Sequence, residues 1–357
     1  MAWREYREHL EENLRDLVAR LKAKRYKPLP ARRVYIPKDE HSQRPLGLPA
    51  LEDKIVQKGM AFILEAIYEA DFLDCSYLKA YFDSVSHPWL MKFLQVRIKD
   101  PSLLLLVQRF LKAGYMEAEQ IVATERGTPQ GGNLSPTLSN IFLHYVLDLW
   151  FEKRLKRQVR GVCFLVRYAD DFVCLVQYQE DAQSITQALR ERFAQFDLEL
   201  HPEKTRTISF GRYERENARR QQRRPHTFDF LGFTHYCGQS RKGKFIVGRQ
   251  TSRKKFRKRC QELKTWLKAV RSRLPVKEWW PVLKAKLRGH YQYYGVSGNM
   301  RGLTCFYRFT VRLVHKWLNR RSQRRTFYWL RFLAYLKHYP LPLPRIVHNL
   351  YTLSPAR

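Results

Sequence analysis

The residues with the clearest chemical potential are two adjacent carboxylates, Asp170 and Asp171, within the tetrapeptide 168–171. Short runs rich in apolar β-branched and aromatic residues flank them, at 162–166 and 172–176. Such runs predict a buried β-hairpin with the carboxylates at its tip. An ionised pair in that setting is costly unless a cation neutralises it. The pattern therefore indicates a site for divalent metal ions, of the kind that nucleotidyl transfer requires.

The alternative for these two residues is an ordinary turn between two surface strands. Asp is common in turns because it tolerates their backbone geometry. Short motifs also match by chance, and only their context confirms them. The rest of the chain must therefore decide between a metal site and a simple turn.

Composition favours a folded protein with a polyanionic partner. The chain has 357 residues, enough for two or three domains, with 44% hydrophobic and 14% aromatic residues and a net charge of +34. Residues 211–357 contain 36 of the 67 Lys and Arg but only 5 of the 33 Asp and Glu. Aromatic residues alternate there with the basic ones: Trp266, Trp279, Trp280, Tyr291, Tyr293 and Tyr294. Phosphate contacts and stacking rings together predict a nucleic-acid surface, with a basic face kept for solubility as the alternative.

The six cysteines form no Cys-x-x-Cys pair and have no His at zinc-finger spacing. We therefore expect reduced thiols, no zinc site and a cytoplasmic location. The N-terminus is charged from Arg4 onward, which argues against a signal peptide. No run reaches the roughly 18 apolar residues of a membrane span, so we expect no membrane partner.

Hydrophobic periodicity predicts an alternation of helices and strands. Helices are expected over residues 4–25, 51–70, 102–113, 138–151 and 180–196, with another starting at the cap region 86–88. Strands are expected at 34–37, 199–200 and 205–210, in addition to the hairpin. This mixture indicates an α+β fold.

The C-terminal part differs in character. Its Arg-rich residues 212–225 predict an exposed loop at a domain edge. A strand pair is expected over 228–236 and 244–249, and helical periodicity runs from Arg253 onward.

Six motifs occur in a fixed order along the chain. They are Arg44–Pro49, Phe82–Val85, Gly127–Gly132 with Leu134–Pro136, Tyr168–Asp171, Leu200–Thr205 and Phe230–Phe233. This series resembles the reverse transcriptases with maturase function that bacterial group II introns encode, over most of residues 10–340. The ordered set is far more specific than any one motif, so it favours the metal site over the chance turn.

The resemblance implies a right-hand polymerase-like fingers and palm region over residues 1–235, with shortened fingers and an antiparallel palm hairpin. Residues 236–357 would form an all-helical basic thumb or maturase X-like domain. The implied activity is RNA-directed DNA polymerase, a nucleotidyltransferase of a mobile element. Its partners would be group II intron-like RNA, a DNA primer and deoxynucleoside triphosphates. Two Mg²⁺ ions, or Mn²⁺ in their place, would lie about 3.5–4 Å apart to activate the primer hydroxyl and neutralise the pyrophosphate.

The resemblance also implies roles for single residues. Asp170 and Asp171 would be the catalytic metal ligands. The nucleotide- and template-binding residues would be Arg44, Phe82, Gln130, Gly131 and Lys204, and the primer region would include Leu231 and Gly232. Each has a structural alternative: a core side chain or strand for Phe82 and residues 230–233, a glycine loop at 130–132, and exposed cations for Arg44 and Lys204.

One departure from the family pattern concerns the first metal-binding Asp. The family segment that carries it is missing, because Asp74–Tyr77 joins directly to Leu78–Asp83. Tyr77 stands six residues before Asp83, where the family has that Asp. Asp74 and Asp83 are the candidate replacements, although strand alternation points Asp74 away from the Tyr77 face and Asp83 lies at the far end. A site with one carboxylate fewer predicts weaker metal binding and reduced activity.

Three interpretations remain open. The chain is an active polymerase that uses Asp74 or Asp83 as third ligand, or an impaired copy that retains RNA binding alone. The third, from outside the family, is a basic nucleic-acid-binding protein whose Asp-Asp turn is incidental.

Overall fold

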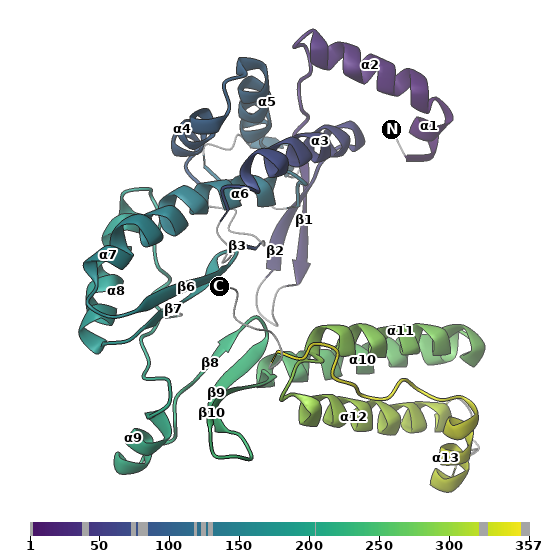
Figure 1. Ribbon diagram of the computed structural model, residues 1–357. Helices are drawn as coiled ribbons and strands as arrows, with labels where there is room; N and C mark the ends of the chain where they lie inside the picture. Colours follow the sequence, from purple (N-terminus) through teal and green to yellow (C-terminus); the bar gives the residue numbers. More distant parts are fainter. Residues whose placement is uncertain are drawn as a thin grey trace. The chain divides into compact units, whose positions relative to one another are not determined.

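The computed structural model divides into two units, Met1–Thr207 and Ile208–Arg357, which are described separately (Figure 1). It describes residues 3–37, 43–72, 76–77, 85–117, 120–122, 126–127, 131–203, 205–320 and 328–350, with the backbone alone at 76–77. The predicted boundary at 235/236 separates functional regions and stays a prediction.

The first half of the N-terminal unit combines helices with a four-stranded sheet. The helices are α1 (Trp3–Glu8), α2 (Leu10–Lys22), α3 (Leu51–Tyr68), α4 (His87–Arg97) and α5 (Pro101–Lys112). The strands are β1 (Ala31–Pro37), β2 (Gln43–Leu48), β4 (Tyr115–Glu117) and β5 (Gln120–Val122), in the order β2-β1-β4-β5. The helices expected at 4–25, 51–70 and 102–113 are confirmed, the first of them divided at His9.

The second half of this unit holds the predicted hairpin, β6 (Cys163–Tyr168) and β7 (Asp171–Val176). Strand β3 (Ser76–Tyr77) pairs parallel with β6, which gives the order β3-β6-β7. One helical run crosses the hairpin: α6 (Ser135–Leu143), the π-helical segments η1 (His144–Asp148) and η2 (Phe151–Leu155), and α7 (Lys156–Gln158). Helix α8 (Gln179–Ala194) follows β7 (Figure 1).

One apolar core joins the hairpin to the helices of the N-terminal unit, α2 to α5 included. Leu138, Phe142 and Phe151 of the helical run pack with Cys163 and Leu165 of β6 in one apolar cluster. The opposite face of the hairpin is open, because Phe164 is 54% and Val166 42% exposed. The predicted hairpin is confirmed, and its burial is limited to one face of β6. Although residues 162–166 form a continuous apolar run, the side chains along β6 alternate strictly between buried and exposed.

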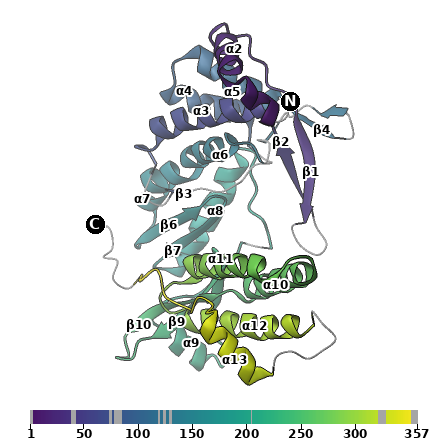
Figure 2. The same cartoon turned by 90° about the vertical axis from the view of Figure 1, so that its right-hand side faces the viewer.

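The C-terminal unit begins with the short helix α9 (Glu214–Arg220) and a sheet in the order β10-β9-β8. Its strands are β8 (Thr227–Phe230), β9 (Phe233–Gln239) and β10 (Phe245–Thr251). Helices α10 (Arg253–Arg273), α11 (Val276–Tyr294), α12 (Met300–Asn319) and α13 (Trp329–His338) follow (Figure 2). Their apolar faces form a second core, which includes Leu267, Trp279, Leu287 and Val314.

Three sequence-based expectations need correction. Residues 199–200 and 205–210 form no strand, because Leu198 and Leu200 anchor an irregular segment on the core and Pro202 lacks an N–H for pairing. Residues 212–225 contain helix α9 instead of a loop, since Glu214 and Ala218, one turn apart, are both buried. The region 236–357 is also not wholly helical: most of β9 and all of β10 precede α10.

Candidate active site

Asp170 and Asp171 lie where the hairpin turns. Tyr168 pairs with Asp171 across the strands, so Ala169 and Asp170 form a two-residue turn. Both aspartates are exposed. Exposed carboxylate oxygens are the donors that Mg²⁺ prefers, so the two side chains fit this cation.

The turn has an unusual backbone. Ala169 has φ of 65° and is only 3% exposed. Glycine is usual at a positive φ, because any other L-residue brings its Cβ close to the neighbouring carbonyl. This conformation must therefore be held by its surroundings.

A buried ion pair lies directly beneath the turn. Arg167 Nε donates to Asp148 Oδ1 at 2.7 Å and Arg167 Nη2 to Asp148 Oδ2 at 2.5 Å. Arg167 Nη1 donates to the carbonyl oxygen of Ala169 at 3.0 Å. The two side chains are 1% and 0% exposed. His144, on η1 with Asp148, is buried as well, and desolvation lowers its pKa.

The third metal ligand stays a prediction. Strand β3 pairs Tyr77 with Tyr168, so its backbone runs beside the carboxylate-bearing hairpin. Asp74, Phe82 and Asp83 lie outside the described residues. Within the described ranges, no group of three or more His, Cys, Asp or Glu residues could hold a metal ion.

The predicted nucleotide-binding residues of the N-terminal unit come from two elements that touch. Arg44 is exposed on β2, opposite Ile36 of β1. Gly131 has φ of 110°, and a Cβ there would lie 2.5 Å from the carbonyl oxygen of Gly47 on β2. Gln57 on α3 fixes the same loop by accepting from the Asn133 N–H at 2.9 Å. The loop is thus joined to β2 and α3, while its role in nucleotide binding is untested, and Gln130 and Lys204 lie outside the described residues.

The predicted primer residues form a tight turn in the C-terminal unit. Leu231 (φ 51°) and Gly232 (φ 81°) link β8 to β9, where Phe230 pairs with Phe233. Two positive φ values fit the two-residue turns that suit hairpin twist. The Tyr293 hydroxyl donates to the Leu231 carbonyl oxygen at 2.9 Å. The motif is therefore a fixed turn of the C-terminal unit.

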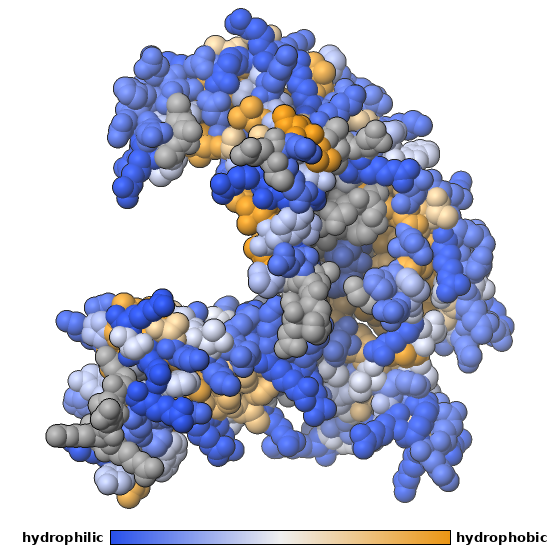
Figure 3. All heavy atoms as spheres, turned by 180° about the vertical axis from the view of Figure 1, so that it is seen from behind, coloured by the Kyte–Doolittle hydropathy of each residue, from blue (hydrophilic) through white to orange (hydrophobic). Residues whose placement is uncertain are grey.

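The C-terminal unit exposes many basic side chains, but most of the aromatic rings predicted to stack on bases are buried. The first two turns of α10 expose six cations: Arg253, Lys254, Lys255, Arg257, Lys258 and Arg259. The face of the molecule in Figure 3 is mostly hydrophilic, with smaller hydrophobic patches. Trp279, Trp280, Tyr291 and Tyr294 are 1–6% exposed core residues, which corrects the prediction, and of the predicted rings only Tyr293 is well exposed, at 55%.

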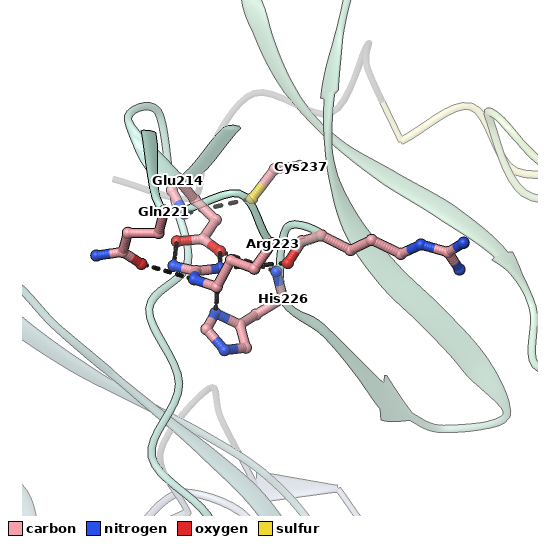
Figure 4. A network of polar contacts seen from close by, with 7 residues as sticks. Glu214, Gln221, Arg223, His226 and Cys237 are labelled. Atoms are coloured by element: carbon pink, nitrogen blue, oxygen red, sulfur yellow. Dashed lines mark hydrogen bonds and ion pairs between the residues drawn. The ribbon is translucent and has the colours of Figure 1, made fainter. Parts of the chain in front are cut away.

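A second buried carboxylate holds the Arg-rich segment in place. Arg223 Nη1 donates to Glu214 Oε1 at 2.5 Å, and the His226 backbone N–H donates to the same oxygen at 2.8 Å (Figure 4). The Glu214 side chain is 0% exposed. Its hydrogen bond from Arg223 lowers the pKa of Glu214 to about 2. Helix α9 is thereby fixed, with Tyr213 and the cations Arg215, Arg219 and Arg220 exposed.

Sequence reasoning missed Arg167 and Asp148. The available signal was the position of Arg167, which follows Cys163 and Leu165 at every second residue of the apolar strand. A cation at an inward position needs a buried partner. Asp148 could not have been named as that partner, because no local pattern links the two residues.

Comparison with known proteins agrees with the geometry of the hairpin. Residues 72–235 match the family described as reverse transcriptase (RNA-dependent DNA polymerase). The chain is 32% identical over 225 residues to protein YkfC of Escherichia coli, covering 46% of this chain and 58% of YkfC. It is 37% identical over 173 residues to the group II intron-encoded protein LtrA of Lactococcus lactis, covering 39% of this chain and 29% of LtrA. A putative COX1/OXI3 intron 2 protein of Saccharomyces cerevisiae is 32% identical over 163 residues, covering 37% of this chain and 19% of the yeast protein.

The chain contains a reverse transcriptase domain with homology to proteins encoded by group II introns. By family, this is the domain of RNA-directed DNA polymerases. The predicted resemblance is thus confirmed, and the chain spans 58% of YkfC and 29% of LtrA. Among the residues that the structure describes, no helix has the length and apolar character needed to cross a bilayer.

Proposed function

We propose that the chain is an RNA-directed DNA polymerase of the group II intron-encoded type, with a maturase-like RNA-binding C-terminal region. The observation that supports this most is the exposed pair Asp170 and Asp171 at the turn of a reverse transcriptase hairpin. Reverse transcriptases generally use Mg²⁺, and the two carboxylates would hold it. The bound cation would supply Lewis-acid stabilisation of charge during nucleotidyl transfer.

The chain's own residues would do the remaining work. The exposed Arg44 on β2, together with the loop at Gly131, would contact template and nucleotide. The turn at Leu231 and Gly232 would contact the primer. The cations of α10 would bind the RNA backbone, with strong dependence on salt. Cytoplasmic location and intron-like RNA as partner complete the proposal.

A second candidate is a chain that binds RNA but no longer polymerises. It is favoured by the sequence, which has Tyr77 at the position where the family pattern has its first metal-binding Asp. It would keep the charge of residues 211–357, which contain 36 Lys and Arg and 5 Asp and Glu.

Primer extension on an RNA template with Mg²⁺ or Mn²⁺ separates the candidates. We expect extension by the purified full chain and a loss of at least about 100-fold in Asp170→Ala, because bound metal contributes several kcal/mol to the transition state. Glu199→Ala, which removes another exposed carboxylate, is the matched control. Salt-dependent RNA binding by folded protein without any extension would reject the polymerase in favour of the second candidate.

A further inference from the structure

Strand β6 points a charged side chain into the core. Its inward positions are Cys163, Leu165 and Arg167, which are 1%, 5% and 3% exposed. The first two are apolar, as the alternation requires, whereas a buried guanidinium carries a large desolvation cost. A charge in this position therefore calls for an explanation in terms of what it contacts.

Asp148 neutralises this cation without accounting for its presence. The carboxylate is 0% exposed and receives both Nε and Nη2 of Arg167. It is carried by the π-helical segment η1, and such segments inside helices are often found at functional sites. Replacing a buried ion pair by well-packed apolar residues is commonly neutral or stabilising. Stability alone therefore does not explain why the strand has an arginine here.

The remaining hydrogen bond of the Arg167 guanidinium explains why an arginine occupies this position. Its Nη1 donates to the carbonyl oxygen of Ala169 at 3.0 Å, and this carbonyl belongs to the peptide group that joins Ala169 to Asp170. The same peptide follows the positive φ of Ala169, a conformation that needs outside support. The planar guanidinium thus donates hydrogen bonds to the Asp148 carboxylate along one edge and to the turn carbonyl along another.

We propose that Arg167, aligned by Asp148, is a positioning residue for the metal-binding carboxylates. It fixes the peptide between Ala169 and Asp170, so that the Asp170 side chain leaves the turn in one direction before a cation arrives. Lysine does not replace it, because a single ammonium lacks the rigid fork that reaches both the carboxylate and the carbonyl. This inference rests on the proposed function of Asp170 and Asp171.

Binding of Mn²⁺ to the full-length chain, followed by electron paramagnetic resonance, tests the inference without relying on polymerase activity. We expect Arg167→Lys to weaken Mn²⁺ binding by about 10-fold, the lower end of the effect of groups that orient metal ligands. The matched control is Arg160→Lys, the same change at a side chain that is 75% exposed. Primer extension should in parallel need about 10-fold more Mg²⁺ for half-maximal rate, with RNA affinity unchanged.

A second variant covers the case in which Arg167→Lys does not fold. The double variant Arg167→Gln with Asp148→Asn buries no unpaired charge and also leaves the Ala169 carbonyl without the guanidinium, so the same loss of Mn²⁺ affinity is expected. Wild-type Mn²⁺ affinity in either folded variant overturns the inference. Binding that is equal in the wild type and in Asp170→Ala would instead overturn the metal assignment itself, and the inference with it.

Discussion

Among the described residues, each unit has a buried carboxylate paired with an arginine side chain, and the two pairs differ in their exposure to solvent. In the N-terminal unit, Asp148 and Arg167 are 0% and 1% exposed. In the C-terminal unit, Glu214 is 0% exposed, but Arg223 is 28% exposed. The first pair is sealed on both sides, whereas the second is open to water on its cationic side.

The two pairs also support surfaces of opposite charge. The sealed pair lies beneath the turn that presents Asp170, and the open pair anchors the helix that presents the cations around Arg215. Neither charge of a sealed pair can be hydrated, so loss of one partner leaves the other as an uncompensated buried charge. An open pair tolerates loss of its carboxylate better, because the arginine can be hydrated. The same kind of ion pair thus supports an acidic turn when it is sealed from water and a basic helix when its arginine is open to water.

The largest effect is expected from Asp148→Leu. It leaves the Arg167 cation buried without a counter-charge, which should lower the free energy of unfolding by about 3–5 kcal/mol. Urea denaturation of the full chain measures this. The double variant Asp148→Leu with Arg167→Met should recover most of the loss, because it removes the uncompensated charge as well. Equal losses in the single and double variants would show that the pair is not electrostatically sealed.

A smaller, pH-dependent effect is expected from Glu214→Gln. The pKa of Glu214 is lowered from 4.5 to about 2. Because the folded-state pKa is depressed, its stabilisation is fully present above the unfolded-state value of 4.5 and is lost as pH falls through about 2. The wild type should therefore exceed Glu214→Gln by about 1–3 kcal/mol near neutral pH, and the difference should vanish towards the lower value.

The control for this titration is Glu216→Gln on the same helix. Glu216 pairs with Arg220, and both side chains are largely exposed, at 58% and 74%. Such a surface pair contributes at most about 1 kcal/mol. A difference between wild type and Glu214→Gln that stays constant down to pH 2 would contradict the low pKa of Glu214.

Periodicity and motif order were sufficient to predict the carboxylate hairpin, most helices and the reverse transcriptase domain. These features depend on local sequence, as in β6, where the inward residues recur at every second position. Helix α9 was missed because its two inward residues, Glu214 and Ala218, are concealed by a composition typical of an exposed loop. Local composition does not reveal that Arg223 pairs with the buried carboxylate or that the backbone N–H of His226 donates to it.

The prediction of a stacking surface was wrong for a related reason. Trp279 and Trp280 occur among basic residues in the sequence, yet both belong to the helical core, at 1% and 6% exposure. An amphipathic helix places neighbouring residues on different faces, so adjacency to lysine says little about access to a ligand. The alternation along β6 could have indicated Arg167 as an inward residue, but its pairing with Asp148 could not be predicted, since it joins a strand to a π-helical segment through tertiary packing.

The smallest effect is expected from substitutions in the two turns, at Ala169 and at Leu231. Ala169 (φ 65°) and Leu231 (φ 51°) are both non-glycine residues at a positive φ, and a side chain holds each carbonyl: Arg167 the first, Tyr293 the second. Glycine relieves the backbone strain but adds freedom to the unfolded chain, so Ala169→Gly should change the free energy of unfolding by no more than about 1 kcal/mol.

Leu231→Gly is the matched substitution, and the same small change is expected in urea denaturation if both turns are fixed by the groups that hold their carbonyls. A loss well above 1 kcal/mol in Ala169→Gly alone would mean that the Ala169 methyl group, buried at 3% exposure, fixes the turn by packing. Arg167 would then be one of two supports for Asp170, and the contrast between the sealed pair and the open pair would be correspondingly weaker.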